Sequence, residues 1–234
     1  MTHAPPAGFW HRCAAWSLDF TVLGLLATAL SWSRLADGWH ASVAATDGLA
    51  TAMQSALGRA LEQGQSADAL SAGLLGDAGV VASAGAVQSA LVGMAVSWLL
   101  VYAVAGLLYH VGFEQSPWQG SPGKHALGLR VVDAATDGPV ALYQSFLRHV
   151  AGVLSWLTLN LGHALAAVPP QKRALHDYLA GTRVTMPIDV PQRLPGWARA
   201  WLVLQVLACV LPLAWLVQQA MAALQAGMLG TAAG

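Results

Sequence analysis

The chain has 234 residues, of which 56% are hydrophobic and only 9% are charged. Soluble domains carry about 25% charged residues, so this chain has too few to cover a surface that faces water. Its formal net charge of zero at pH 7 argues against a nucleic-acid partner, which would require a basic face. The two cysteines, Cys13 and Cys209, lie in apolar runs without a metal-binding spacing. These features indicate an integral membrane protein in a lipid bilayer, with no metal or other cofactor.

Four stretches are candidate membrane segments, which need about 20 apolar residues each. They are Cys13–Trp32, Ala90–Phe113 within an uncharged run from Ala78, Val150–Val168, and a stretch from Arg199 to Ala223. Asp19 interrupts the first stretch and argues against a cleaved signal peptide. The third stretch differs from the others because Asn160 and His163 lie near its middle, where a simple span is most apolar.

The first connecting loop, residues 34–86, is rich in Ala, Gly and Ser. Leu49, Met53, Leu57 and Leu61 recur at every fourth residue, which predicts an amphipathic helix. Such a helix would lie on the membrane surface or cap the bundle, or it would bind a partner or gate a substrate. The sequence does not discriminate between these roles.

The second loop, residues 114–145, combines turn residues with a short strand. Two prolines and two glycines lie between Pro117 and Gly123, which is typical of turns. Residues 127–133 then predict a strand, and the Asp137-Gly138 turn leads to residues 140–142. We therefore expect a small β-hairpin in this loop.

The distribution of Lys and Arg indicates the orientation, because these residues collect on the cytoplasmic side. If all four stretches cross fully, the better orientation places seven of the eleven inside. If Val150–Val168 enters and leaves on the same side, nine are cytoplasmic and only Arg34 and Arg59 are outside. The second count favours three full crossings, a re-entrant third segment and a cytoplasmic N-terminus. The expected fold is an all-α polytopic transmembrane bundle of three to four membrane segments.

Three blocks of sequence, in this order, resemble the RDD family of membrane proteins. They are Gly8-Phe-Trp-His-Arg12-Cys-Ala-Ala-Trp-Ser-Leu-Asp19, Ser116-Pro-Trp-Gln-Gly-Ser-Pro-Gly-Lys124 with residues 127–133, and Lys172-Arg-Ala-Leu-His-Asp177-Tyr-Leu-Ala-Gly-Thr182. The family is named for one arginine and two aspartates. Arg12 and Asp19 match the first two, and Asp177 matches the third, with Asp133 as the alternative.

The resemblance implies an RDD-like transmembrane domain over residues 8–186, with an additional C-terminal transmembrane helix and tail over residues 187–234. It also implies a bacterial inner membrane and transport of ions or small solutes, since some members resemble cation/proton antiporters. The chain departs from the family pattern in its long first loop, in the helix after Arg199, and in His125 after Lys124.

Asp19 is the first candidate site residue, because a carboxylate in a membrane helix is costly unless it is paired or reaches water. Arg12 lies two turns before it on the same helical face. One interpretation is structural: Arg12 reaches lipid phosphates, and Asp19 pairs with Lys124, Arg130 or Arg173. The other is that Asp19 binds a proton or cation in a polar cavity.

Four further residues are candidates for the same ion or solute site. His176 and Asp177 follow two basic residues, and they either anchor the loop or form a gate in which His176 titrates. Asn160 and His163 lie three residues apart, so they share a face and either join helices by hydrogen bonds or line a pathway.

Two functional hypotheses follow from these residues. The first is a carrier or channel for a proton-coupled cation or a small solute, in which Asp19, Arg12 and Asp177 act together. The second is an accessory or scaffold protein whose ion pairs are structural. No catalytic triad, zinc pattern or carboxylate pair can be assembled from neighbouring positions, so we do not expect an enzyme. Ser89, Gly93 and Ser97 recur every fourth residue and predict a helix seam, within the chain or in a homo-oligomer.

Overall fold

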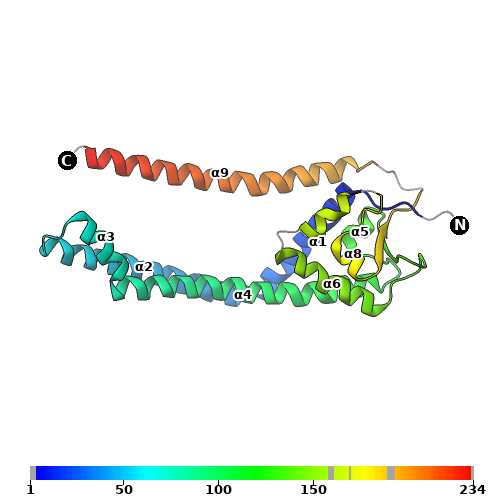
Figure 1. Cartoon of the computed structure of the whole chain (residues 1–234), viewed down its shortest axis with the longest axis horizontal. Helices are drawn as coiled ribbons and strands as arrows, with labels where there is room; N and C mark the ends of the chain where they lie inside the picture. Colours follow the sequence, from blue (N-terminus) through cyan, green and yellow to red (C-terminus); the bar gives the residue numbers. More distant parts are fainter. Residues whose placement is uncertain (1–3, 158–160, 169, 189–192, 233–234) are drawn as a thin grey trace. The chain divides into compact units, whose positions relative to one another are not determined.

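The computed structural model describes all residues except 1–3, 158–160, 169, 189–192 and 233–234 (Figure 1). The described part is mainly helical. In chain order its elements are α1 (Phe9–Leu30), α2 (Trp32–Glu62), α3 (Ala67–Gly76), α4 (Ala78–Glu114), α5 (Pro122–Ala126), β1 (Arg130–Asp133), α6 (Leu142–Leu157), α7 (Leu161–Ala164), the 3-10 turn η1 (Leu165–Ala167), α8 (Leu175–Leu179), β2 (Thr182–Thr185) and α9 (Gly196–Ala232).

Three of the described helices are long and apolar enough to cross a membrane. They are α1, α4 and the part of α9 from Gly196 to Ala222. They coincide with the first, second and fourth predicted segments, so the all-α transmembrane architecture is confirmed. The helix α4 has 37 residues and begins at Ala78, well before the most apolar part of its sequence.

The third predicted segment, Val150–Val168, is not one of these three helices. The 16-residue helix α6 ends at Leu157, and the four-residue helix α7 begins at Leu161. A helix of 16 residues is about 24 Å long, which is shorter than the hydrocarbon core. Asn160 lies outside the described residues. Both short helices contact α8, so the segment belongs to the packed part of the chain that carries the candidate site.

The two strands form a sheet between distant parts of the chain. The strand β1 is where the sequence predicts it, but it pairs antiparallel with β2, in the register Val131 to Val184. The expected hairpin partner, residues 140–142, is not a strand, and the Asp137-Gly138 turn gives only a single bridge between Val132 and Pro139. The longer pairing is favoured because it buries Val131 and Val184 completely.

The chain divides into two compact units. The first unit holds residues 1–21 and 109–234. Its core is built mostly from small and β-branched side chains of α1, the second loop, the two strands and α9. The core residues are Ala7, Ala14, Ala15, Leu127, Leu129, Val131, Val140, Val184, Met186 and Ala198. In this unit α9 joins α1 through two hydrogen bonds, from Trp201 Nε1 to Ser17 Oγ and from Gln205 Nε2 to Thr21 Oγ1.

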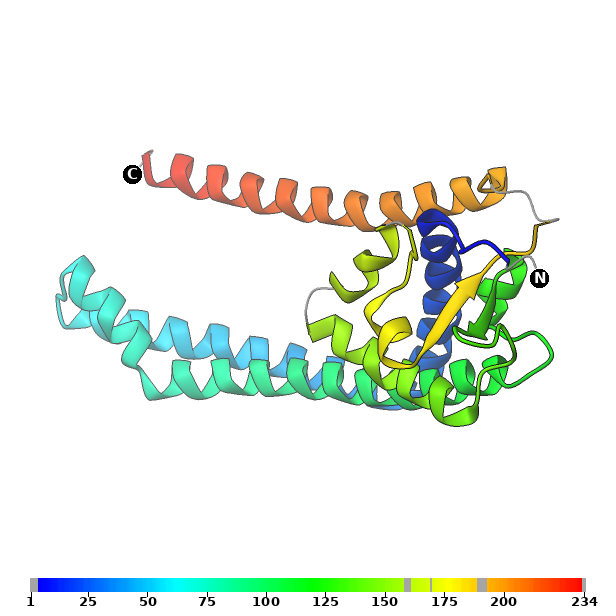
Figure 2. The ribbon, with the colours of Figure 1, turned by 45° about the vertical axis from the view of Figure 1, so that its right-hand side comes forward.

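The second unit, residues 22–108, contains α2 and most of α4, which run side by side (Figures 1 and 2). The two helices approach so closely that a methyl group at Gly38 would lie 2.2 Å from Cγ of Met94. The helix α2 confirms the predicted amphipathic helix. Its buried side chains are Ser42, Ala56 and Ala60, however, and Met53, Leu57 and Leu61 of the apolar stripe are exposed. The stripe is therefore free to face lipid or a partner.

Replacing Gly181 with alanine will destabilise the fold by about 1 to 2 kcal/mol, the cost of a left-handed conformation for a residue with a Cβ. Gly181 has φ +64° just before β2, and its carbonyl accepts a hydrogen bond from Ala134 N at 2.9 Å. A Cβ at this position would have ordinary contacts, so the backbone conformation alone causes the loss. Thermal unfolding measures it. Gly152→Ala in α6 is the control and should be neutral or stabilising, because no atom lies within 4 Å of its Cβ position.

Candidate functional site

Asp19 lies in α1 with 2% of its surface exposed and accepts hydrogen bonds from three neutral donors. Tyr109 Oη donates to Oδ1 at 2.9 Å, and the backbone N–H of Gly123 donates to the same oxygen at 2.8 Å. The hydroxyl of Ser121 donates to Oδ2. Among the described residues Asp19 forms no ion pair, so the candidate cations Lys124, Arg130 and Arg173 are not its counterions.

The first turn of α5 reaches Asp19 because its second residue, Gly123, is a glycine. A Cβ at Gly123 would lie 2.3 Å from the carbonyl oxygen of Ala15 and 2.8 Å from Asp19 Oδ1. Only a residue without a side chain allows the backbone N–H to approach the carboxylate this closely. Pro122 begins α5, where the missing N–H of proline costs nothing. The Ser-Pro-Gly sequence therefore fits a loop that is docked on α1.

Arg12 pairs with Asp177 instead of Asp19. Arg12 Nη1 is 2.6 Å from Asp177 Oδ2, and Arg148 Nη1 is 2.7 Å from Asp177 Oδ1. Asp177 has no exposed side-chain surface, and it also accepts the backbone N–H of Ala174 at 3.0 Å. This carboxylate joins α1, α6 and α8, so it is the link between three separate parts of the sequence.

A second carboxylate extends this arrangement. Glu114, at the end of α4, has Oε1 3.3 Å from Arg148 Nε and 3.3 Å from Lys124 Nζ. Its side chain is 3% exposed. We call Arg12, Lys124, Arg148, Glu114 and Asp177 the buried charge network. Because α1 and α4 are two of the three helices long and apolar enough to cross a membrane, the network lies where one end of each of these two helices meets the loops.

Two histidines adjoin the network. His176 Nε2 is 3.4 Å from Arg148 Nη2, and the ring centroids of His176 and His163 are 4.8 Å apart. Because the arginine can only donate, Nε2 of His176 is the acceptor and its proton lies on Nδ1. Nδ1 of both histidines is buried without a hydrogen-bond partner among the described residues.

The surroundings shift the pKa values of these groups in defined directions. Burial raises the pKa of the Asp177 carboxyl, but the charges of Arg148 and Arg12 and the hydrogen bond from Arg12 outweigh burial and hold the pKa well below its ordinary value. Burial lowers the pKa of His176 well below 6.5, although Asp177 opposes the shift. The pKa of His163 is lowered as well, first by burial and then by Arg148. Both imidazoles are therefore neutral at pH 7, and Asp177 is charged.

The structure brings together most of the predicted site residues, but in two groups. Asp19 lies with Tyr109, Ser121 and Gly123, whereas Arg12, His176, Asp177 and His163 belong to the charge network and its histidines. Asn160 lies outside the described residues. Asp133 is the alternative third family residue. Its carboxylate accepts hydrogen bonds from the N–H groups of Ala135 and Thr136 and so caps a turn. The hydrogen bond from the Gln144 amide is the main cause that lowers the pKa of Asp133 to about 2.

Sequence reasoning missed Glu114, Arg148 and Tyr109. Glu114 is the first charge after an uncharged run of 36 residues, from Ala78 to Phe113, which is a signal that could have identified it. Arg148 lies on the polar face of the amphipathic helix α6, with Gln144 and Ser155, and its role depends on contacts with α4 and α8 that the sequence does not reveal. The described residues include no group of three or more His, Cys, Asp or Glu suited to a metal ion.

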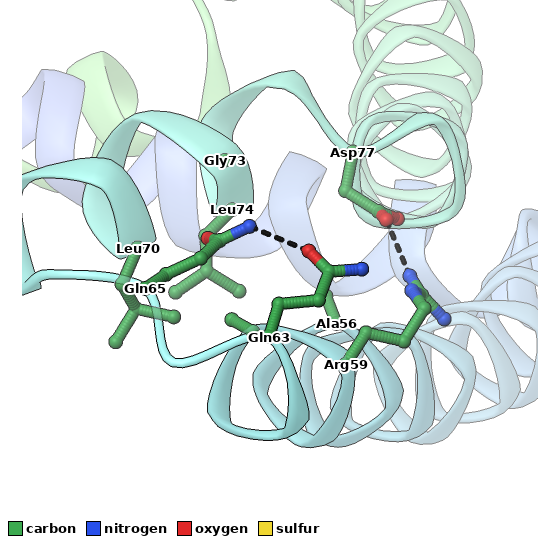
Figure 3. A pocket seen from close by; sticks show the side chains of 9 residues that line it. Ala56, Arg59, Gln63, Gln65, Leu70, Gly73, Leu74 and Asp77 are labelled. Atoms are coloured by element: carbon green, nitrogen blue, oxygen red, sulfur yellow. Dashed lines mark hydrogen bonds and ion pairs between the residues drawn. The ribbon is translucent and has the colours of Figure 1, made fainter.

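A small pocket lies within the second unit, at the end of α2 (Figure 3). Its volume is about 120 Å³, and polar side chains surround an apolar floor. Arg59 pairs with Asp77 at 2.5 Å, and Gln65 Nε2 donates to Gln63 Oε1 at 2.8 Å. Asp77 also caps α4 through the N–H groups of Gly79 and Val80. These contacts explain how α3 folds back on α2 without invoking a ligand.

Comparisons with known proteins agree with the sequence blocks. A model of the RDD family matches residues 6–181. The "Uncharacterized protein YxaI" of Bacillus subtilis (strain 168) is 34% identical over 86 residues, which are 37% of this chain and 56% of that protein. The chain thus spans about half the length of the curated relative it matches. No solved structure matches the chain.

Replacing Gly123 with alanine will cost about 1 to 3 kcal/mol of stability, the usual penalty for forcing a methyl group into a packed site. The added Cβ would overlap the Ala15 carbonyl, a backbone atom that cannot rotate away. Thermal unfolding in detergent measures the effect. Gly112→Ala in α4 is the matched control, since no atom lies within 4 Å of its Cβ position. An equal response of the two variants would contradict the docked loop.

The unfolding free energy will fall as the pH drops below about 6.5. The unfolded chain takes up protons on His176 and His163 there, whereas the folded chain holds both pKa values lower and does not. Each such histidine contributes a slope of up to about 1.4 kcal/mol per pH unit. The test is denaturant unfolding between pH 8 and 5. His176→Asn should reduce the slope of the unfolding free energy against pH. The control is His40→Asn in the exposed part of α2, which should leave this slope unchanged. If His176→Asn also leaves the slope unchanged, His176 is not a source of the pH dependence.

Proposed function

Since the chain belongs to the RDD family of membrane proteins, we propose that it transports a proton-coupled cation or another small solute, with Asp19 as the group that binds the ion. The proposal rests on one observation: the hydrogen-bond donors around this membrane carboxylate are all neutral. An ionised carboxylate in a membrane helix requires a compensating charge. A proton or a bound cation can supply that charge, and either one can leave again.

The contrast with Asp177 supports this choice. Asp177 is neutralised by two arginines, whose side chains remain charged at any physiological pH. A permanent pair of this kind does not exchange its counterion. Asp19 has no such partner among the described residues, so its charge state is free to follow the proton or cation that it binds.

The chemistry around Asp19 also suits a hard cation. Two carboxylate oxygens, the Tyr109 hydroxyl and the Ser121 hydroxyl meet at this point. Hard cations such as Na⁺ favour oxygen ligands of this kind. A hydroxyl that donates to the carboxylate can rotate and offer a lone pair instead, because it is both donor and acceptor. The same group of residues can therefore hold either a proton or a cation.

The charge network has a supporting role in this proposal. Arg12, Asp177 and Arg148 fix the first turn of α1 against α6 and α8, and the neutral imidazoles of His176 and His163 lie beside them. Nine of the eleven Lys and Arg residues would face the cytoplasm with the N-terminus inside and residues 150–168 re-entrant. We propose this orientation in a bacterial inner membrane.

A second function is supported by a different observation. Three donors already satisfy Asp19, as expected for a carboxylate that only anchors a loop. In that case the chain is an accessory or scaffold protein, and the exposed apolar stripe of α2 is its working surface. Self-association through a helix seam at Ser89, Gly93 and Ser97 is compatible with both proposed functions. Neither proposed function is that of an enzyme.

Replacing Asp19 with asparagine will abolish or strongly reduce cation flux. Asparagine fills the same space, and its one oxygen can accept the bonds from Gly123 and Tyr109 while its NH2 group donates to the Ser121 hydroxyl, but it has no charge to balance a proton or cation. The measurement is uptake of Na⁺ or K⁺ into proteoliposomes with an imposed pH gradient, compared with empty liposomes and with the wild-type chain.

Asp133→Asn is the matched control, because it removes a carboxylate that caps an exposed turn far from Asp19 in the sequence. We expect wild-type flux from this variant. Flux that persists in a folded Asp19→Asn protein would rule out the ion-binding role. A wild-type chain without flux, together with an Asp19→Asn variant that no longer folds, would favour the accessory role.

A further inference from the structure

The short helix α5 and the loop before it cover Asp19, although they contribute no side chain to the hydrophobic core. Residues 116–126 supply two of the three donors to Asp19, the hydroxyl of Ser121 and the N–H of Gly123. The buried residues of this segment are glycines and a serine, and the first core residue after α4 is Leu127. Lifting residues 116–126 from α1 would therefore uncover Asp19 without opening the apolar core.

A row of aromatic rings joins this segment to α4. The rings of Phe113 and Trp118 are stacked with their centroids 5.5 Å apart, and Trp118 is stacked on His125 at 4.4 Å with an interplanar angle of 6°. At the other end of the row, Tyr109 meets Phe113 edge-on at 5.0 Å. Because Tyr109 donates to Asp19 and His125 belongs to α5, the row connects the two elements that surround the carboxylate.

Burial alone does not account for this row. The surface of Trp118 is 41% exposed, and His125 is exposed as well. Exposed side chains keep one geometry only where their contact outweighs the rotamer freedom that they lose. His125 is also a position at which the chain departs from the RDD pattern, and the stack gives its imidazole ring a role.

The other contacts of the segment are polar. Lys124 Nζ lies 3.3 Å from Glu114 Oε1, and the carbonyl oxygen of Gln119 accepts a hydrogen bond from Val131 N at 2.6 Å. Gln119 has φ +51°, a left-handed conformation that is unfavourable for a residue with a Cβ and persists only where contacts hold it. The closed position of residues 116–126 thus depends on contacts outside the core, among which the aromatic row can be removed by one substitution.

We propose that the stack of Phe113, Trp118 and His125 is a latch that positions α5 on Asp19, and that release of this latch opens Asp19 to water. In the closed position Asp19 has 2% of its surface exposed, so a hydrated cation cannot reach it. Release removes the donors of α5 and its preceding loop and leaves the carboxylate oxygens accessible. The use of this opening for ion exchange rests on the proposed function, whereas the latch itself exists equally in an accessory protein.

The test is hydrogen–deuterium exchange of the full chain in nanodiscs, measured by mass spectrometry on peptides within residues 116–126. Trp118→Ala removes the ring that the two stacks share, so we expect the amides of this segment, that of Gly123 included, to exchange about tenfold faster. Trp118→Phe keeps an aromatic ring and should restore most of the protection.

The matched control is Trp16→Ala. Trp16 is stacked on Phe20 at 5.2 Å and is 42% exposed, so the change removes an equally exposed stacked ring from the same unit. It should leave the exchange of residues 116–126 unchanged. An increase in Trp118→Ala that is confined to this segment supports the latch. No increase, or an equal increase in α6 and in the two strands, overturns it.

A chemical readout reports on Asp19 itself. A water-soluble carbodiimide with an amine nucleophile converts an accessible carboxyl group into an amide, and mass spectrometry identifies the modified residue. Asp19 should be modified about tenfold faster in Trp118→Ala than in the wild type or in Trp16→Ala. An unchanged rate would overturn the proposal even if the amides of the segment exchange faster.

His125→Ala decides the question if Trp118→Ala does not fold, because it removes an exposed ring and keeps the stack of Phe113 on Trp118. Exchange and modification should both become faster, by a smaller factor, and no change in either would overturn the latch. Flux is measured separately in proteoliposomes. A wild type without flux counts against transport, whereas the latch is decided by exchange and modification alone.

Discussion

The double ion pair of Asp177 with Arg12 and Arg148 is the interaction on which the first unit depends. A carboxylate with no exposed surface is tolerated only because two guanidinium groups and a backbone N–H compensate its charge. These contacts fix the first turn of α1 to α6 and α8, and Arg148 continues the network to the end of α4 through Glu114. Loss of one partner would leave an unpaired buried charge, so the network holds as a whole.

Asp19 and Asp177 show that the same buried side chain can have different roles. Asp177 lies among arginines and keeps a fixed charge, whereas Asp19 lies among hydroxyl groups and one backbone N–H and has no permanent counterion among the described residues. The difference is set by neighbours, not by burial, since both side chains are almost completely buried. This difference is the reason why we propose a role in ion exchange for Asp19 and a structural role for Asp177.

Particular elements show where sequence reasoning succeeded and where it did not. The apolar runs behind α1, α4 and α9 were predictable because membrane crossing depends on length and composition alone. The partner of β1 was not predictable, since a local turn suggested a hairpin and the strand instead pairs with Thr182–Thr185. The pairing of Arg12 with Asp177 was also not predicted. The two-turn spacing suggested that Arg12 acts with Asp19, whereas its partner Asp177 lies 165 positions away in the sequence.

The sequence by itself determined that the chain is an α-helical membrane protein with RDD-type blocks. It also identified a small set of charged residues in or near the membrane segments that need a partner. Hydrophobic length, the scarcity of charge and local turn residues are properties of neighbouring positions, so they can be read without coordinates. Only the tertiary structure decided which cation meets which carboxylate and that Glu114 and Arg148 belong to the same network. Ion pairs depend on distances of a few ångströms between segments far apart in the chain, and packing alone sets those distances.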